Sequence, residues 1–215
     1  MSHFTPYLVR IGCVAVALVF WFWTQKLISR KASTGDQIGD RIHDWTAPLH
    51  GWLLASPRAA NATLITTSAL IDVFGLFLIG AAVFGPTCRP FVALLLVFGL
   101  RQMCQGICTL PYPQKPIWRD PGVPSLLVTY GTSNDFFFSG HTSIAMIGAM
   151  EIAQVAPTWL AVVAGSIAVL EAITVIVLRA HYTMDVFAAV FAAWASDVVA
   201  HRIAPTIDAW ISLLG

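Results

Sequence analysis

The sequence feature that most constrains the fold is a series of apolar runs, each long enough to cross a bilayer. A hydrocarbon core of about 30 Å is crossed by about 20 residues of α-helix. Such runs occupy residues 8–28, 61–84, 90–110, a stretch from about Phe138, 158–178 and 182–203. Only 11% of the 215 residues are charged, against about a quarter in soluble domains. We predict an all-α polytopic membrane protein, a single domain (1–215) with six transmembrane helices around one active site.

Charge and cysteine content exclude several kinds of protein. The net charge of +1 provides no basic surface for nucleic acid. The four cysteines form no CxxC pair, and three of them lie in apolar runs, where cysteine packs as a small hydrophobe. We therefore expect no disulfide framework and no zinc site, and the histidine chemistry predicted below needs no metal and no cofactor. The first apolar run leads through Trp21, Phe22 and Trp23 into Lys26, as expected for an uncleaved anchor rather than a signal peptide.

The order of the segments brings distant residues to one face of the membrane. Acidic and apolar residues alternate at helical spacing around 36–45, which predicts a short amphipathic helix on the surface. Residues 111–137 are rich in proline and predict a long, packed, functional loop. Six spans leave both termini on one side. On the other side the third span ends, and the fourth and sixth spans begin.

Two histidines at these helix starts suggest phosphate chemistry. His181 and Asp185 are four residues apart, so on a helix the carboxylate orients the imidazole and leaves its other nitrogen as a nucleophile. His141 follows Ser139 and Gly140 at a helix start, where free backbone N–H groups favour an anion. Ser139 is a candidate helix cap, and Gly140 allows a close approach of phosphate. We predict that His141 protonates the leaving oxygen.

The remaining titratable residues have competing interpretations. Arg179, two residues before His181, is a candidate phosphate ligand. The other histidines (His3, His43, His50 and His201) are interpreted as solvated residues at helix ends. Asp72, Arg101 and Glu171 lie inside apolar runs, where charged groups are costly and usually functional. Arg101 either pairs with one of these acids or contacts phosphate.

These residues resemble motifs of the lipid phosphate phosphatase superfamily, and more closely its headgroup-transferase branch. That branch includes sphingomyelin synthases and plant phosphatidylcholine:diacylglycerol cholinephosphotransferases. Asp135-Phe-Phe-Phe-Ser-Gly-His-Thr142 resembles their first histidine motif, and His181-Tyr-Thr-Met-Asp-Val186 their second. Arg101 with Thr109-Leu-Pro-Tyr-Pro113 resembles a third element. Pro48-Leu-His-Gly-Trp-Leu-Leu54 is closer to the plant enzymes, and the resemblance covers about residues 43–200.

The resemblance implies a phospholipid donor, a lipid alcohol acceptor and a phosphohistidine intermediate. His181 would be the nucleophile, Asp185 its orienting group and His141 the acid and then the base. Arg101, Asp135, Ser139, Gly140, Arg179 and Tyr182 would bind substrate. The Lys-x6-Arg-Pro element of the phosphatases is missing, and Thr174 and Val175 replace their Ser-Arg pair, which disfavours a plain phosphatase. Asn134 stands where the motif of the sphingomyelin synthases has a glycine, so the motif does not identify ceramide as the acceptor.

Membrane sidedness is the point on which the sequence gives conflicting indications. The side with the histidines carries eight basic residues against three on the other (Lys26, Arg30, Lys31, Arg41, Arg58, Lys115, Arg119 and Arg179 against Arg10, Arg89 and Arg202). The positive-inside rule would make that side cytoplasmic. The resemblance implies a periplasmic or luminal site with cytoplasmic termini, and we follow it because the motifs are more specific than a charge count.

The sequence therefore predicts an enzyme that moves phosphocholine or phosphoethanolamine to diacylglycerol or a ceramide-like acceptor. A lipid phosphatase or phospholipase C-like hydrolase, with water as acceptor, is the main alternative. A transporter or haem-binding bundle is the non-enzymatic alternative, although transporter sites usually lie at the midplane rather than at helix ends.

Overall fold

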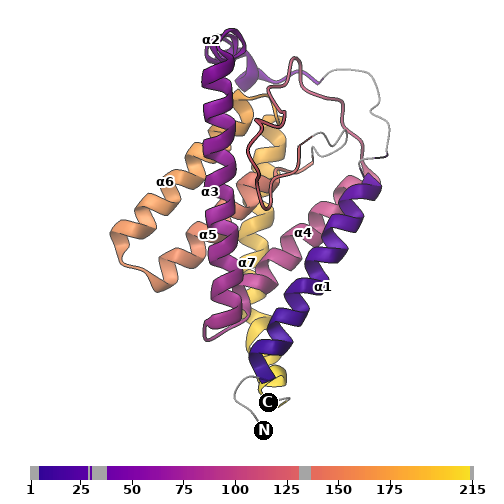
Figure 1. The fold of residues 1–215 in the computed structure, drawn as a ribbon, viewed down its shortest axis with the longest axis vertical. Helices are drawn as coiled ribbons and strands as arrows, with labels where there is room; N and C mark the ends of the chain where they lie inside the picture. The colour runs from indigo at the N-terminus through magenta and orange to yellow at the C-terminus, as the bar shows by residue number, and fades with distance from the viewer. Residues whose placement is uncertain (1–4, 29, 31–37, 131–136, 214–215) are drawn as a thin grey trace.

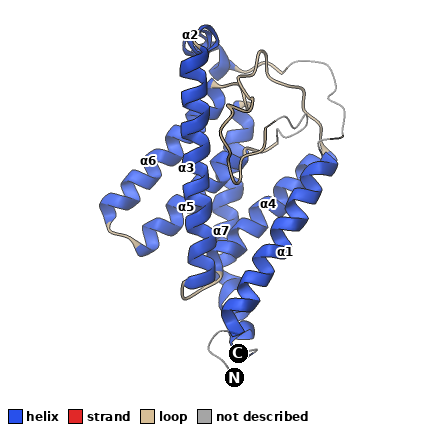
Figure 2. Cartoon of the chain, viewed as in Figure 1, coloured by secondary structure: helices blue, strands red, loops and turns tan. Residues whose placement is uncertain are grey.

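The computed structural model describes residues 5–28, 30, 38–130 and 137–213. The described chain is helical, with no strand in these ranges (Figure 2). There are seven helices in it: α1 Thr5–Ile28, α2 Arg41–Ala55, α3 Pro57–Phe84, α4 Arg89–Ile107, α5 Gly140–Val155, α6 Thr158–Val177 and α7 Thr183–Leu213. Between α4 and α5, the described residues of the predicted long loop (111–130 and 137) form no helix. The all-α prediction is therefore confirmed for the described residues.

Five of the helices are long and apolar enough to cross a membrane, which supports an integral membrane protein. They are α1 (over Pro6–Leu27), α3, α4, α6 and α7. Their bounds agree with the predicted runs to within a few residues, except that α7 continues ten residues beyond 203 to Leu213. Pro205 lies within α7 without ending it.

The predicted fourth span is the exception, so the prediction of six spans is not confirmed. Helix α5 has 16 residues, which at 1.5 Å per residue is about 24 Å and less than a hydrocarbon core. It begins after the Ser139 cap and stops before Pro157, which cannot continue the hydrogen-bonding pattern of a helix. Buried residues make up most of α5, which packs against α3, α4, α6 and α7.

A close approach between α3 and α5 shows how tightly α5 is enclosed. A β-carbon on Gly148 would lie 2.4 Å from Cδ1 of Phe74, so only glycine fits beneath that ring. Phe74 and Gly148 are both buried, and the surrounding apolar cluster includes Ile144 and Ile147 of α5. Helix α5 is therefore a core element of the bundle.

The two ends of the helical bundle differ in the elements and charged residues that lie there. Helix α1 begins and α7 ends at the same end, as predicted for the termini (Figure 1). Arg10 of α1 lies 3.5 Å from Asp208 of α7 there, and Arg89 of α4 donates to both carboxylate oxygens of Glu151 at 2.9 and 2.5 Å. At the opposite end, which we call the site end, α4 finishes, α5 and α7 begin, and α2 lies across the top (Figure 1).

The predicted surface helix corresponds to α2, which begins and ends later in the chain than the expected segment around 36–45. Asp40 caps it by accepting from the amides of Ile42 and His43 at 3.0 and 3.4 Å. Trp45 and Trp52 are exposed, whereas His43, His50 and Leu53 are buried against the rest of the chain. The helix is therefore amphipathic, with two histidines on its buried face.

Candidate active site

His141 lies in the first turn of α5, and two hydrogen bonds of Ser139 hold the start of this helix. The Oγ atom of Ser139 accepts from the amide of Thr142 at 3.3 Å, so the predicted cap is confirmed. The amide of Ser139 donates to the carbonyl oxygen of Asp185 at 3.2 Å, which ties the start of α5 to α7. The Trp118 ring from the loop meets the His141 ring edge-on, with centroids 5.0 Å apart.

His181 and Asp185 form the predicted pair, but not on one continuous helix. Their Nδ1 and Oδ2 atoms are 3.4 Å apart, and Asp185 is 1% exposed. Helix α7 begins only at Thr183, so His181 lies in the turn before it. The Oδ2 atom of Asp185 also accepts from the amide of Tyr182 at 2.9 Å. The carboxylate therefore fixes both the ring and the backbone beside it, from the first turn of the helix.

One cavity brings together four of the predicted site residues. Arg101 from α4, Gly140 and His141 from α5, and His181 all line it, together with Trp21, Tyr112 and Trp118. Arg101 is 4% exposed, and its Nε donates to the carbonyl oxygen of Phe138 at 2.7 Å. A β-carbon on Gly140 would lie 3.5 Å from the Arg101 guanidinium carbon. We call this space the histidine cavity.

Arg179 and Tyr182, two further predicted substrate ligands, contact α2 instead of lining the histidine cavity. Arg179, at a left-handed φ of 58°, donates from one terminal nitrogen to the carbonyl oxygen of His43 at 2.6 Å. The Tyr182 ring stacks on the His43 ring, with centroids 5.6 Å apart. Neither residue is among those that line the histidine cavity. Their predicted contact with substrate stays a prediction, and so does that of Asp135, which lies outside the described residues.

The interpretation of His43 and His50 as solvated residues is wrong. They are 4% and 6% exposed. His43 donates from Nε2 to the carbonyl oxygen of His181 at 3.0 Å, and His50 donates from Nδ1 to that of Val177 at 2.8 Å. Burial lowers the pKa of both histidines, which favours the neutral rings. The sequence signal available was their spacing of seven residues, which puts both on one face of α2. His201 is half exposed, and His3 lies outside the described residues.

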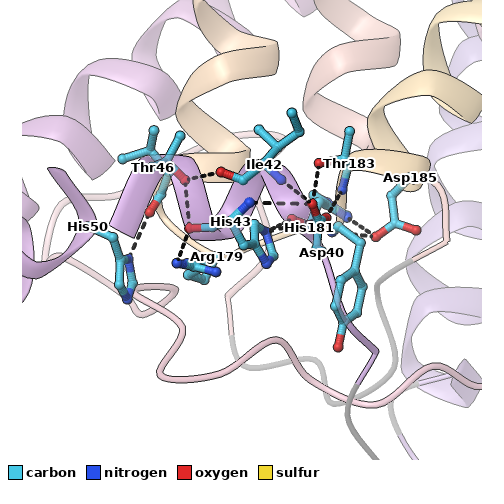
Figure 3. A network of polar contacts seen from close by, with 11 residues as sticks. Asp40, Ile42, His43, Thr46, His50, Arg179, His181, Thr183 and Asp185 are labelled. Atoms are coloured by element: carbon cyan, nitrogen blue, oxygen red, sulfur yellow. Dashed lines mark hydrogen bonds and ion pairs between the residues drawn. The ribbon is translucent and has the colours of Figure 1, made fainter. Parts of the chain in front are cut away.

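Asp40 completes the attachment of α2 to the site. Besides capping α2, it accepts from the amide and the hydroxyl of Thr183, the first residue of α7, at 2.6 and 2.8 Å. Burial by itself raises the pKa of Asp40, but the Thr183 donors and nearby His43 outweigh it, so the net pKa lies below the usual value. Asp40, His43, His50 and Arg179 thus bind α2 to residues 177–183, and we call this set the α2 clasp (Figure 3).

Asp72 and Glu171, two acids within the spans, have hydrogen-bond partners other than Arg101. Asp72 accepts from the amides of Leu126 and Leu127 in the loop at 2.8 and 2.9 Å. Glu171 accepts a short hydrogen bond from the Thr67 hydroxyl between α6 and α3. Within the described ranges neither acid pairs with Arg101, so the predicted arginine–acid lock is replaced by two separate contacts. These ranges also hold no cluster of three or more His, Cys, Asp or Glu side chains suited to a metal ion.

The apolar helices and the two-histidine cavity define an integral membrane protein with a polar site at one end of a helical bundle. A family model described as AtPDCT1/2, of the phosphatidylcholine:diacylglycerol cholinephosphotransferase family, matches residues 40–202. That match covers more than half of the chain, so the chain belongs to this family of membrane phosphotransferases. Neither the curated proteins nor the solved structures give a match.

Proposed function

We propose that this protein transfers phosphocholine from phosphatidylcholine to diacylglycerol through a phosphohistidine intermediate. One observation carries the proposal: His141 and His181, from segments 40 residues apart, line one cavity with Arg101, while Asp185 lies 3.4 Å from Nδ1 of His181. The family membership supports phosphocholine as the transferred group and diacylglycerol as the acceptor.

In the first half-reaction, Nε2 of His181 attacks the phosphorus of phosphatidylcholine. Asp185 holds Nδ1, which leaves Nε2 with the lone pair that a nucleophile needs. The bond from phosphorus to the glycerol oxygen breaks as the N–P bond forms. His141 gives its proton to that oxygen, and diacylglycerol leaves. Arg101 stabilises the negative charge on the phosphoryl oxygens with its fixed positive charge.

In the second half-reaction, an incoming diacylglycerol hydroxyl gives its proton to the now neutral His141. The hydroxyl oxygen attacks phosphorus, the N–P bond breaks, and His181 regains its neutral ring. The two halves balance, since His141 ends protonated as it began and no phosphate is lost. The chemistry is symmetrical, so the enzyme exchanges diacylglycerol with the diacylglycerol part of phosphatidylcholine.

An acceptor screen with purified protein in nanodiscs tests the proposal. Labelled diacylglycerol, ceramide or water is offered with unlabelled phosphatidylcholine, and lipid products are separated. We expect label from diacylglycerol to enter phosphatidylcholine, and no product with His181→Ala. Release of water-soluble phosphocholine that diacylglycerol does not reduce would establish the hydrolase instead. Preferential formation of sphingomyelin would establish ceramide as the acceptor. An absorption band of bound haem would favour the non-enzymatic alternative.

We also propose, from the resemblance to the transferase branch, that the site end faces the periplasm or lumen. A cysteine placed at Lys115, in a variant without the four native cysteines, reports this directly. A membrane-impermeant maleimide added outside intact cells or sealed vesicles of known orientation should label it from the external side. Labelling only from the cytoplasmic side would reverse the orientation, in line with the charge count.

A further inference from the structure

A second cavity, made almost wholly of hydrocarbon, adjoins the histidine cavity. Most of its wall consists of residues from three helices, among them Val14, Ala17 and Leu18 of α1, Ile79 of α3, and Leu94 and Leu95 of α4. All three of these helices are candidate membrane spans. We call this space the apolar cavity.

The two cavities share a wall. Trp21, Phe98, Leu127 and Ile144 line both of them. The rings of Trp21 and Phe98 meet edge to face, with centroids 5.6 Å apart and planes at 72°. A ligand that occupies both spaces must therefore pass these four side chains.

Helix α1 provides a wall that is open to the bilayer. Only 6% of its apolar window is buried, which is much less than for the other spans. Away from the site end, a further apolar space continues between α1, α4 and α7, and Val14, Phe91 and Leu95 line both it and the apolar cavity. The hydrocarbon-lined space thus runs along α1 toward the far end of the bundle.

The partition between the two cavities has its own support from α3. Asp72 binds the amides of Leu126 and Leu127, and Gly75 lies one turn farther along the same face. A β-carbon on Gly75 would be 1.9 Å from Cδ1 of Leu127, so glycine makes room for that side chain. The intramembrane acid and the glycine together set the position of the loop residue between the cavities.

We propose that the apolar cavity holds a fatty acyl chain of the phosphatidylcholine donor. This inference rests on the proposed function. The histidine cavity offers Arg101 and two imidazoles to a phosphate, whereas the apolar cavity offers almost no polar surface and disfavours a headgroup. A phospholipid carries both chemistries in one molecule. The donor fits as the occupant because its phosphate must reach His181, and the shared wall gives its chain a route from the histidine cavity into a hydrocarbon-lined space.

A cavity-filling substitution with a matched control tests the inference. Ala17→Phe puts a ring into the apolar cavity, whereas Ala15→Phe puts the same ring on the exposed face of α1, where it lines neither cavity. Each variant is assayed with a long-chain and a dihexanoyl phosphatidylcholine donor and the same diacylglycerol acceptor. We expect Ala17→Phe to lower kcat/KM for the long-chain donor at least tenfold, or about 1.4 kcal/mol, and to leave the dihexanoyl donor within about twofold. Ala15→Phe should leave both unchanged.

Equal losses with both donors in Ala17→Phe, or no loss with the long-chain donor, would overturn the inference. A binding measurement separates it from the proposed function, because it needs no turnover. Phosphatidylcholine with a diazirine near the end of one acyl chain should label peptides from α1 and α4 in the wild-type protein, and much less in Ala17→Phe. Labelling confined to other helices would refute the acyl site even if transfer is observed. Labelling of α1 and α4 without any transfer would instead support the acyl site and refute the proposed function.

Discussion

Replacement of Asp40 by alanine tests whether the α2 clasp holds in place the turn that carries His181. The side chain of Asp40 is 7% exposed and accepts four hydrogen bonds, two from the start of α2 and two from Thr183. An N-cap contributes about 1 kcal/mol. A hydrogen bond to a charged acceptor contributes about 1.5 kcal/mol at the lower end of its range. The two Thr183 bonds therefore add about 3 kcal/mol.

The sum of about 4 kcal/mol is an upper value, because water replaces part of what is lost. At about 2–4 °C per kcal/mol for a chain of this size, a loss of 2–4 kcal/mol lowers the thermal midpoint by roughly 4–16 °C. We also expect kcat to fall between tenfold and a hundredfold. Thr183 starts the helix that carries Asp185, and Asp185 orients His181.

The assay compares Asp40→Ala with Asp40→Asn and Asp44→Ala in the same nanodiscs. Asn keeps an oxygen for the cap but loses the charge that faces Thr183, so its effect should be intermediate. Asp44 is an exposed acid one turn farther along α2, and its removal should change neither the thermal midpoint nor kcat. If Asp40→Ala behaves like Asp44→Ala in both measurements, the clasp does not support the site and this reasoning fails.

Two further predictions concern the histidines and their partners. Asp185→Asn should lower kcat by several orders of magnitude with a smaller change in KM, because the amide no longer fixes the His181 tautomer. Single-turnover rates measure this loss. Near-normal turnover would remove Asp185 from the mechanism. Burial lowers the pKa of His43 and His50 despite the nearby Asp40, while Arg179 and Lys115 oppose protonation. The unfolded chain therefore binds more protons below about pH 6.5, and stability should fall as the pH drops through that value. The thermal midpoint from pH 8 to 5 measures it, and His43→Gln should flatten the profile; an unchanged slope would contradict the assignment.

Helix positions were largely predictable because bilayer-length apolar runs depend on local composition alone. The run at 158–178 became α6, Thr158–Val177, and the run at 90–110 became α4, Arg89–Ile107. Two departures from the predicted spans have physical causes. Helix α5 ends at Val155, two residues before Pro157, and other helices enclose it, so the predicted fourth span is not confirmed. Helix α7 continues past the polar residues near 201 and 202, since these remain exposed at its surface.

The site was predictable only in part, for a different reason. Spacing within one motif identified His181 with Asp185, and span counting predicted that His141 lies near His181, with which it lines one cavity. The clasp depends on contacts between residues more than 120 positions apart, such as His50 with Val177. Local patterns do not encode such contacts. From the sequence alone, His43 and His50 are therefore predicted to be solvated, because the exposed Trp45 and Trp52 lie beside them and the docking of α2 is not known.

The clasp also explains how His181, the proposed nucleophile, is held outside a helix. The turn from 178 to 182 links α6 and α7, where the regular backbone hydrogen bonding of a helix is interrupted. Asp185 binds this turn from the α7 side, through the amide of Tyr182. Helix α2 holds it as well, because His43 donates to the carbonyl oxygen of His181 and His50 donates to that of Val177, the last residue of α6. His181 is thus fixed between two elements that are far apart in sequence, and its ring is aimed into the histidine cavity by the docking of a surface helix as much as by its own motif.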